Sequence, residues 1–342
     1  MLLQRGHRVC LVDPIGAGPQ TAAAGTAAAL GLLMAQVYRR SSGRGWRLRQ
    51  RSLQLWQQWS DQLAETGPAL PLRPGLLQLA ADPAELEQQQ RLVQERTAKG
   101  FPLRLLTEEE LAQLRPHGPA GVLGGLFSPL DGQLDPIASR QRLLQDALSR
   151  GLELVSDRAE AIAAGPGPDR WRIHLAAGSR IETPWLLVCA GMASGALLEP
   201  LGHQRPLAPV LGQALELQLP AGCDAQQWPG SLVFQGINLV PRPGGRLWLG
   251  ATLEPDRAAG DPGDPSAREA LRQLNGHAPD WLRAATPLRH WHGLRARPVG
   301  RPAPLLEPLA PGLLLLSGHY RNGVLLAPAS AAWAAEQIAA NP

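Results

Sequence analysis

Cysteine is scarce in this chain of 342 residues, and the few that are present exclude several kinds of protein. Cys10, Cys189 and Cys223 are odd in number, widely spaced and never arranged as a Cys-x-x-Cys pair. Neither a disulfide framework nor a cysteine-based zinc site is therefore expected. Because free thiols persist in reducing compartments, the sequence predicts a cytoplasmic protein.

Lysine is almost missing too, since Lys99 is the only one and nearly all of the positive charge is arginine. The net charge of +4 is small for this length, and the densest basic stretch, residues 39–51, has Trp46 as its only aromatic residue. Sites for single-stranded nucleic acid combine basic residues with several stacking aromatics. A nucleic-acid partner is therefore not expected.

Long apolar runs are also absent. Residues 21–38 carry no charge, but they are mostly Ala and Gly rather than Leu or Ile, so their transfer into lipid is weakly favourable. The N-terminal region reaches Asp13 after one short apolar run, which is too little for the apolar core of a signal peptide. Neither an integral membrane segment nor a signal peptide is predicted.

What the chain does contain is a globular composition, with 44% hydrophobic and 18% charged residues. Its length exceeds the size at which one core keeps growing, so two cooperating domains are expected. Caps, apolar periodicity and turn residues predict the individual elements. Helices are expected at residues 48–63, 83–96 and 136–150, after the capping box of Thr107 and Glu110, and from Gly323; a turn is expected at Asp131; and strands are expected at residues 9–12, 76–79, 152–155, 171–175, 186–190, 206–219, 231–240, 246–252 and 313–316.

The apolar run at residues 9–12 is typical of a parallel strand buried on both faces, and Asp13 stands at its C-terminal end. In doubly wound nucleotide-binding folds, an acidic residue at this place accepts hydrogen bonds from the ribose hydroxyls. An aspartate that merely caps the next turn is the structural alternative, and this residue alone does not separate the two.

No glycine-rich phosphate turn precedes this strand. Residues 1–5 followed by Gly6 have the pattern of the last turn of a helix with its C-terminal glycine. Gly16 and Gly18 come after the acidic strand end instead of about 20 residues before it, so they indicate an ordinary loop. We therefore expect the chain to be N-terminally truncated, with the first strand and the GxGxxG turn lying upstream of Met1.

Four segments resemble motifs of glycine oxidase and its D-amino-acid-oxidase relatives, a family of FAD-dependent oxidoreductases. The most specific is residues 318–329, with the sequence GHYRNGVLLAPA. The others, in the order of the family, are TAAAG at residues 21–25, the pair PR at 241–242 followed by GAT at 250–252, and WHGLR at 291–295. Together they span almost the whole chain, from residue 21 to residue 329.

The resemblance implies an α/β fold in which a Rossmann-like FAD-binding domain carries an inserted antiparallel-sheet α+β substrate domain. The FAD-binding domain would comprise residues 1–70, 136–205 and 286–342. The substrate domain would comprise residues 71–135 and 206–285.

The function implied is the FAD-dependent oxidative deamination of glycine, a small amino acid or a secondary amine. This expectation includes hydride transfer to the flavin and reoxidation by O2 with release of hydrogen peroxide. It also includes a role in thiamine biosynthesis and a homo-oligomeric state. Two alternatives stay open: an amino-acid dehydrogenase that passes electrons to a quinone or carrier, and a flavin-free remnant that acts as a binding protein.

Arg295 and Arg321 are the candidate substrate clamp, because a planar guanidinium binds a carboxylate through two parallel hydrogen bonds. The resemblance matches Arg295 to the arginine that binds the substrate carboxylate and places Arg321 beside the flavin and the substrate. Two further substrate positions depart from the family: Asn238 replaces a tyrosine, and Leu253 replaces a methionine that lines the pocket.

The cofactor residues implied by the resemblance lie in several separate segments. They are Asp13, Pro14, Gln20, Ala24, Gly25, Thr26, Glu160, Gly191, His319, Tyr320, Arg321, Asn322, Gly323, Val324 and Leu325. A helix that begins at Gly323 would direct the positive end of its dipole at the flavin, and Pro328 is expected near its first turn. His290 and His292 could face the same side of a strand, but they have no third ligand at a fixed spacing, so no metal site is expected.

Overall fold

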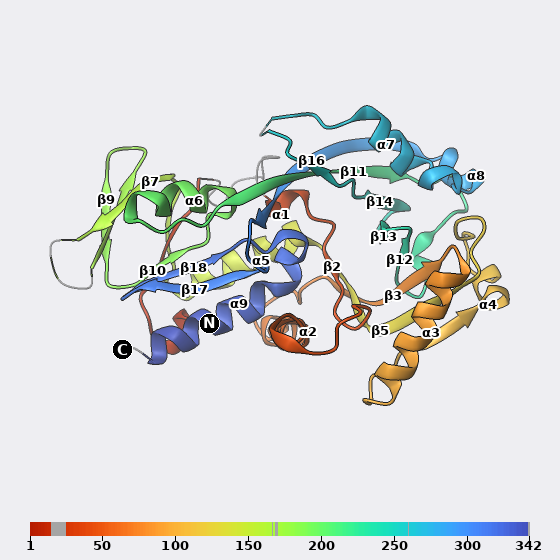
Figure 1. The fold of residues 1–342 in the computed structure, drawn as a ribbon, viewed down its shortest axis with the longest axis horizontal. Coiled ribbons are helices and arrows are strands. Elements are labelled where there is room, and N and C mark those ends of the chain that lie inside the picture. Colours follow the sequence, from red (N-terminus) through yellow and green to blue (C-terminus); the bar gives the residue numbers. More distant parts are fainter. Residues whose placement is uncertain (15–24, 166, 168–169, 259, 341–342) are drawn as a thin grey trace.

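The computed structural model describes residues 1–14, 25–165, 167, 170–258 and 260–340. Over this part of the chain it is an α/β fold, as the sequence predicted, and its largest sheet has ten strands (Figure 1). The strands of this sheet are β2 (Leu32–Leu33), β3 (Leu72–Ala80), β4 (Arg104–Thr107), β5 (Gly124–Leu134), β11 (Leu207–Gln218), β12 (Ser231–Phe234), β13 (Ile237–Arg242), β14 (Arg246–Gly250), β15 (Glu254–Pro255) and β16 (Thr286–Pro298).

Three smaller sheets complete the β-structure of the described residues. β1 (Cys10–Val12) pairs in parallel with β6 (Glu153–Val155). β18 (Leu313–Ser317) lies between β10 (Leu186–Val188) and β17 (Leu305–Ala310). The third sheet contains β7 (Ala159–Ala164), β8 (Trp171–Leu175) and β9 (Arg180–Thr183).

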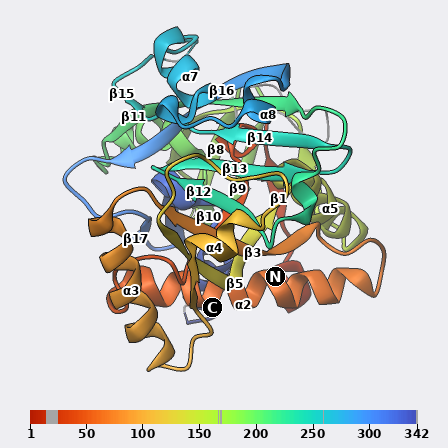
Figure 2. The same cartoon turned by 90° about the vertical axis from the view of Figure 1, so that its right-hand side faces the viewer.

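The helices pack around these sheets, as Figures 1 and 2 show. They are α1 (Gly25–Ala28), α2 (Gly43–Ala64), α3 (Pro83–Thr97), α4 (Glu108–Ala112), α5 (Pro136–Ser149), α6 (Ser194–Leu198), α7 (Pro265–Arg272), α8 (Asp280–Arg283) and α9 (Gly323–Ala340), with short 3-10 turns that include η2 (Gly191–Ala193) and η6 (Tyr320–Asn322). No helix in the described ranges is both long and apolar enough to cross a membrane.

Several predicted helix starts are confirmed by their caps. The Asp82 side chain accepts a hydrogen bond from the backbone N–H of Glu85 at 2.8 Å and begins α3. Thr107 and Glu110 form the expected capping box of α4. Each cap satisfies a backbone N–H that has no partner within its own helix, which is why these short polar motifs predict helix starts well.

Two predictions about the strands were wrong. Residues 231–240 form β12 and β13 instead of one strand, because Gln235 and Gly236 reverse the chain with φ angles of 47° and 77°. A two-residue hairpin turn requires this left-handed backbone. Asp131 lies inside β5 and not in a turn; its buried carboxylate accepts hydrogen bonds from the backbone N–H groups of residues 35–37 at 2.6 to 3.1 Å.

The ten-stranded sheet is covered on both faces by apolar side chains. On one face, Leu217, Leu239 and Leu247 pack with Leu271 of α7 and Leu282 of α8. On the other, Val240, Trp248 and Trp291 pack with Leu30 and Ala214. The strands run from β16 and β11 at the top of Figure 2 down to β5, with α2 beneath. The second face carries the candidate site.

Two further findings concern the predicted domains. β16 lies in a segment assigned to the FAD-binding domain, yet it pairs with β11 from Leu207 to Gln218, inside the large sheet. Among the described residues, β1 pairs only with β6, and Cys10 and Leu11 are exposed where burial on both faces was expected. The division of the chain into two domains stays a prediction.

Pro328 lies beyond the first turn of α9, contrary to the prediction. Side chains of α2 provide hydrogen bonds to the helix backbone at this place. A proline inside a helix cannot donate to the carbonyl four residues earlier, here that of Val324. Trp56 Nε1 donates instead to the carbonyls of Val324 and Leu325, each at 3.2 Å. The N–H of Ala329 donates to Ser52 Oγ at 3.2 Å. Side chains of α2 therefore act as hydrogen-bond partners for the backbone groups of α9 around Pro328.

Candidate active site

The register of four strands places the candidate substrate residues on one face of the large sheet. Asn238 of β13 pairs with Gly250 of β14, which pairs with Ala214 of β11, which pairs with Trp291 of β16. Side chains alternate between faces along a strand, so Arg295 lies on the same face as Trp291. The two predicted substrate residues Asn238 and Arg295 therefore share this face.

Arg295 is held by backbone carbonyl groups. Its Nη1 donates to the carbonyl of Leu211 at 3.2 Å and to that of Thr252 at 3.1 Å. Burial, followed by the nearby charge of Arg321, lowers the pKa of Arg295 to about 10. The guanidinium is therefore still charged at neutral pH, and its other nitrogens are not engaged by these two carbonyls.

Gly212 lies directly beneath this guanidinium, and no sequence pattern indicates its role. A Cβ atom built at Gly212 would be 2.1 Å from Nη2 of Arg295 and 2.4 Å from its Cζ. No side chain fits in that space while Arg295 keeps its position. A strand glycine often marks such a close approach, but this one stands among many glycines in the chain.

Arg321 belongs to η6, beside β16, and its side chain is exposed. Its positive charge contributes to the lowered pKa of Arg295, so the two guanidinium groups lie close enough to interact. Within the described ranges, Arg321 has neither an acidic partner nor a hydrogen-bond acceptor. The fold thus brings the two predicted clamp residues together and leaves one of them unneutralised.

The other two substrate residues have different surroundings. Asn238 is partly buried, and its Nδ2 donates to the carbonyl of Gly250 at 2.9 Å, which fixes the orientation of the amide. Leu253 directly follows the residue whose carbonyl holds Arg295, and 53% of its side chain is exposed. A large apolar side chain left in contact with solvent beside Thr252 is free to contact a ligand, and this role stays a prediction.

The C-terminal motif forms a tightly held loop between β18 and α9. His319 Nε2 lies 2.8 Å from Ser330 Oγ, and the Ser330 hydroxyl donates to the carbonyl of Leu326 at 2.9 Å. Burial lowers the pKa of His319 to about 4, so its ring is neutral at pH 7. Since the single hydroxyl proton of Ser330 is used, His319 donates through Nε2 and keeps Nδ1 as an acceptor.

The rest of this loop is fixed by its backbone and by one side-chain contact. Tyr320 has a left-handed φ of 54°. Asn322 Oδ1 accepts a hydrogen bond from the hydroxyl of Tyr38 at 2.9 Å. α9 then begins at Gly323, while Val324 and Leu325 pack into the apolar core between α2 and α9.

The remaining predicted cofactor residues lie at several element ends. Asp13 and Pro14 follow β1, and the N–H of Asp13 donates to the carbonyl of Val155 at 3.1 Å. Gly25 and Thr26 are in α1, where a Cβ at Gly25 would be 3.6 Å from the carbonyl oxygen of Leu294. Gln20 and Ala24 lie outside the described residues.

Glu160 and Gly191 differ in what surrounds them. Glu160 is exposed on β7 and forms an ion pair with Arg158 at 2.8 Å. Gly191 has a φ of 57°, and a Cβ there would meet no described atom within 4 Å. The backbone at Gly191, just after β10, therefore leaves local room for a bound group. None of the individual cofactor assignments is thereby tested.

Comparison with known proteins identifies the class of protein. The FAD dependent oxidoreductase family (DAO) matches residues 1–337, and the chain belongs to this family. FAD is therefore its cofactor, as the sequence motifs implied.

The relatives by sequence include glycine oxidases. The chain is 39% identical over 146 residues to that of Pseudomonas aeruginosa, covering 42% of this chain and 39% of that protein. It is 28% identical over 238 residues to that of Bacillus licheniformis, covering 69% of this chain and 63% of that protein. Both matches thus span less than two thirds of the relative's own length.

The glycine oxidase structure from Geobacillus kaustophilus has a TM-score of 0.86, with 24% sequence identity, 100% of this chain covered and 90% of that one. This likeness confirms the predicted fold class. It shows the fold alone, because residue roles do not transfer reliably at this identity.

Proposed function

We propose that this protein oxidises the amine of glycine, a small amino acid or a secondary amine that carries a carboxylate. The observation that carries the proposal is the pair Arg295 and Arg321. One guanidinium is partly buried and held by two carbonyl groups, and the other lies close by, with no acidic partner among the residues that the structure describes. Two cations in a partly desolvated place are suited to a carboxylate anion.

FAD, when bound, supplies the acceptor for the hydride that leaves the substrate carbon next to the amine. The chain's own residues bind and orient the substrate. Arg295 and Arg321 hold the carboxylate, Asn238 borders the space occupied by the substrate side chain, and Leu253 keeps water away. Positioning of this kind contributes most of what a protein adds to cofactor chemistry.

The cofactor would be held by the segments that the motifs marked. Asp13 and Pro14 would lie at the ribose, and residues 20 and 24–26 would lie along the isoalloxazine. Glu160 would lie near the adenine and Gly191 against the cofactor. Residues 319–325, ending in the start of α9, would place the positive end of a helix dipole near the flavin pyrimidine carbonyl.

The proposal extends to the fate of the product and the electrons. Water would hydrolyse the imine to an oxo acid and ammonia or an amine, and O2 would reoxidise the cofactor with formation of hydrogen peroxide. Glycine oxidase relatives support this proposal over the quinone-linked dehydrogenase and the flavin-free binding protein. A cytoplasmic location, a homo-oligomeric state and a role in thiamine biosynthesis are further parts of it.

The test is to purify the flavin-loaded protein and measure peroxide release in air with glycine, sarcosine, proline and small D-amino acids. Each acid is paired with the corresponding amine that lacks a carboxylate. We expect peroxide with at least one acid and much less with its decarboxylated partner. A flavin-loaded protein that oxidises none of them, or that reduces a quinone without forming peroxide, would contradict the proposal.

A further inference from the structure

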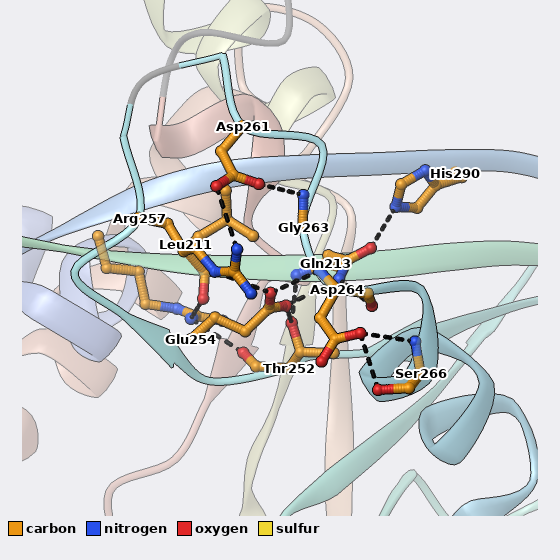
Figure 3. Close-up of polar contacts among 11 residues, drawn as sticks. Leu211, Gln213, Thr252, Glu254, Arg257, Asp261, Gly263, Asp264, Ser266 and His290 are labelled. Atoms are coloured by element: carbon orange, nitrogen blue, oxygen red, sulfur yellow. Dashed lines mark hydrogen bonds and ion pairs between the residues drawn. The ribbon is translucent and has the colours of Figure 1, made fainter.

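Glu254 is a buried carboxylate whose oxygen atoms are occupied by neighbouring groups (Figure 3). Oε1 accepts hydrogen bonds from Thr252 Oγ1 at 2.6 Å and from Gln213 Nε2 at 2.7 Å. Oε2 accepts one from the N–H of Asp264 at 2.8 Å and lies 3.8 Å from Arg257 Nε. Gln213, Thr252 and Glu254 are here called the Glu254 network.

Glu254 is charged at neutral pH even though it is buried. Burial alone would raise its pKa, but the hydrogen bonds from Gln213, Thr252 and the N–H of Asp264 together lower it. Its charge acts on Arg295 and raises the pKa of that residue, opposing the effects of burial and of Arg321. No ion pair forms between Glu254 and Arg295, so this carboxylate does not occupy the clamp.

Thr252 connects the Glu254 network to the substrate clamp. Its hydroxyl donates to Glu254 and accepts a hydrogen bond from the backbone N–H of Gln213 at 2.8 Å. Its carbonyl accepts the hydrogen bond from Nη1 of Arg295 at 3.1 Å. A threonine held by its side chain on two sides presents its carbonyl in one direction, which is the direction of the guanidinium.

Gln213 provides a second connection. It follows Gly212, the residue against which the Arg295 guanidinium lies, and neighbouring residues of a strand point to opposite faces. The Gln213 side chain is fully buried and binds Glu254, the carbonyl of Asp264 at 2.9 Å and His290 at 2.9 Å. Two pieces of backbone hold Arg295: Gly212, against which the guanidinium lies, and the carbonyl of Thr252. Both are therefore anchored by the Glu254 network, from the opposite face of β11.

We infer that Glu254, Gln213 and Thr252 are positioning residues that hold Arg295 in the orientation needed for the substrate carboxylate. The inference rests on the proposed function, in which Arg295 binds that carboxylate. The network keeps a negative charge near Arg295, while hydrogen bonds from Thr252 and Gln213 hold Oε1 of Glu254 and no ion pair forms with Arg295. It thereby favours an arginine that is charged, immobile and still open to an anion.

The experiment measures the binding of acetate to the flavin-loaded protein through the flavin absorption spectrum, together with kcat and KM for the best amino-acid substrate. Thr252→Val keeps the shape of the side chain but removes both hydroxyl hydrogen bonds. We expect its acetate Kd and its KM to rise about five- to thirtyfold, because each lost hydrogen bond accounts for a factor of a few. Flavin content and kcat should change less than about twofold, since the reacting atoms are untouched.

Two variants complete the series and one serves as control. Thr252→Ser restores the hydroxyl and should recover acetate affinity to within about threefold of the unsubstituted protein. Glu254→Gln removes the charge but keeps an oxygen toward Thr252 and Gln213, and should also weaken acetate binding, by about three- to tenfold. Ser266→Ala alters a side chain that binds only the far end of Asp264 and should change nothing.

The outcomes separate this inference from the proposed function. If Arg295→Ala leaves acetate affinity unchanged, the carboxylate clamp itself is wrong. If Arg295→Ala weakens acetate binding while Thr252→Val and Glu254→Gln do not, the positioning role is overturned. It is also overturned if these two variants lose flavin and kcat in parallel without a selective rise in KM, or if Thr252→Ser fails to restore affinity.

Discussion

The guanidinium of Arg295 lies against the backbone of Gly212, so closely that a Cβ atom at Gly212 would be 2.1 Å from Nη2. Glycine at this position of β11 therefore determines where an arginine on β16 can lie. The relationship does not depend on the identity of the substrate.

Gly212→Ala should displace Arg295 without emptying the flavin site. The added methyl group must push the guanidinium away from the carbonyls of Leu211 and Thr252, which are its hydrogen-bond partners. A charge-assisted hydrogen bond contributes about 1.5 to 3 kcal/mol, so we expect kcat/KM to fall by about ten- to hundredfold.

The control for this variant is Gly45→Ala in α2, where the nearest atom to a built Cβ is 3.5 Å away at the flexible end of Arg49. Steady-state kinetics and flavin content should be unchanged there. Equal kcat/KM for Gly212→Ala and the unsubstituted protein would show that Arg295 acts from another position or not at all.

Arg295→Ala should remove the charged hydrogen bonds to the substrate carboxylate. Leaving one member of such a pair without its partner costs about 2 to 5 kcal/mol, which predicts a fall in kcat/KM of about thirty- to several thousandfold. Bound flavin should be almost unchanged. If the variant keeps full activity on glycine, sarcosine and small D-amino acids, Arg295 does not bind the substrate carboxylate.

Much of the fold could be predicted because its signals are local. Asp82 with Pro83, and Thr107 with Glu110, satisfy helix N-termini through residues only a few positions apart. The motif at residues 318–329 likewise predicted the loop and helix that follow β18. Information of this kind lies within one stretch of sequence.

The parts that were missed depend on residues far apart in the chain. Asp131 was assigned to a turn because its partners are the N–H groups of residues 35–37. The roles of Gly212 and the Glu254 network appear only when β11 is paired with β15 and β16. Pro328 was expected near the first turn of α9 because the neighbouring sequence does not show that Trp56 and Ser52, far away in the chain, provide hydrogen-bond partners for the helix there.

Asn238 should determine how large a substrate the protein accepts. The family's tyrosine would offer an aromatic wall and a phenolic hydroxyl, whereas the Asn238 amide is smaller and donates to the carbonyl of Gly250. We expect at least one substrate larger than glycine to have a higher kcat/KM than glycine. Asn238→Tyr should shift the preference back toward the small substrate, and strict preference for glycine in the unsubstituted protein would count against this prediction.

Trp56 should stabilise the fold through its N–H group, because that group donates to the carbonyl of Val324, which Pro328 leaves without its helical partner, and also to that of Leu325. Trp56→Phe keeps a buried aromatic ring but leaves the carbonyl of Val324 without its donor, and an unsatisfied buried polar group costs about 1 to 3 kcal/mol. Urea unfolding should show a loss of this size in the free energy of unfolding. FAD affinity should fall with it, because these carbonyls lie in the first turn of α9, which follows the segment proposed to hold the flavin.

Trp59→Phe is the matched control. Trp59 packs edge-on against Trp56 at 5.7 Å and makes no comparable bond with a described residue, so its loss should be below about 1 kcal/mol. Equal destabilisation by the two substitutions would mean that ring packing, and not the hydrogen bond to α9, is what Trp56 contributes.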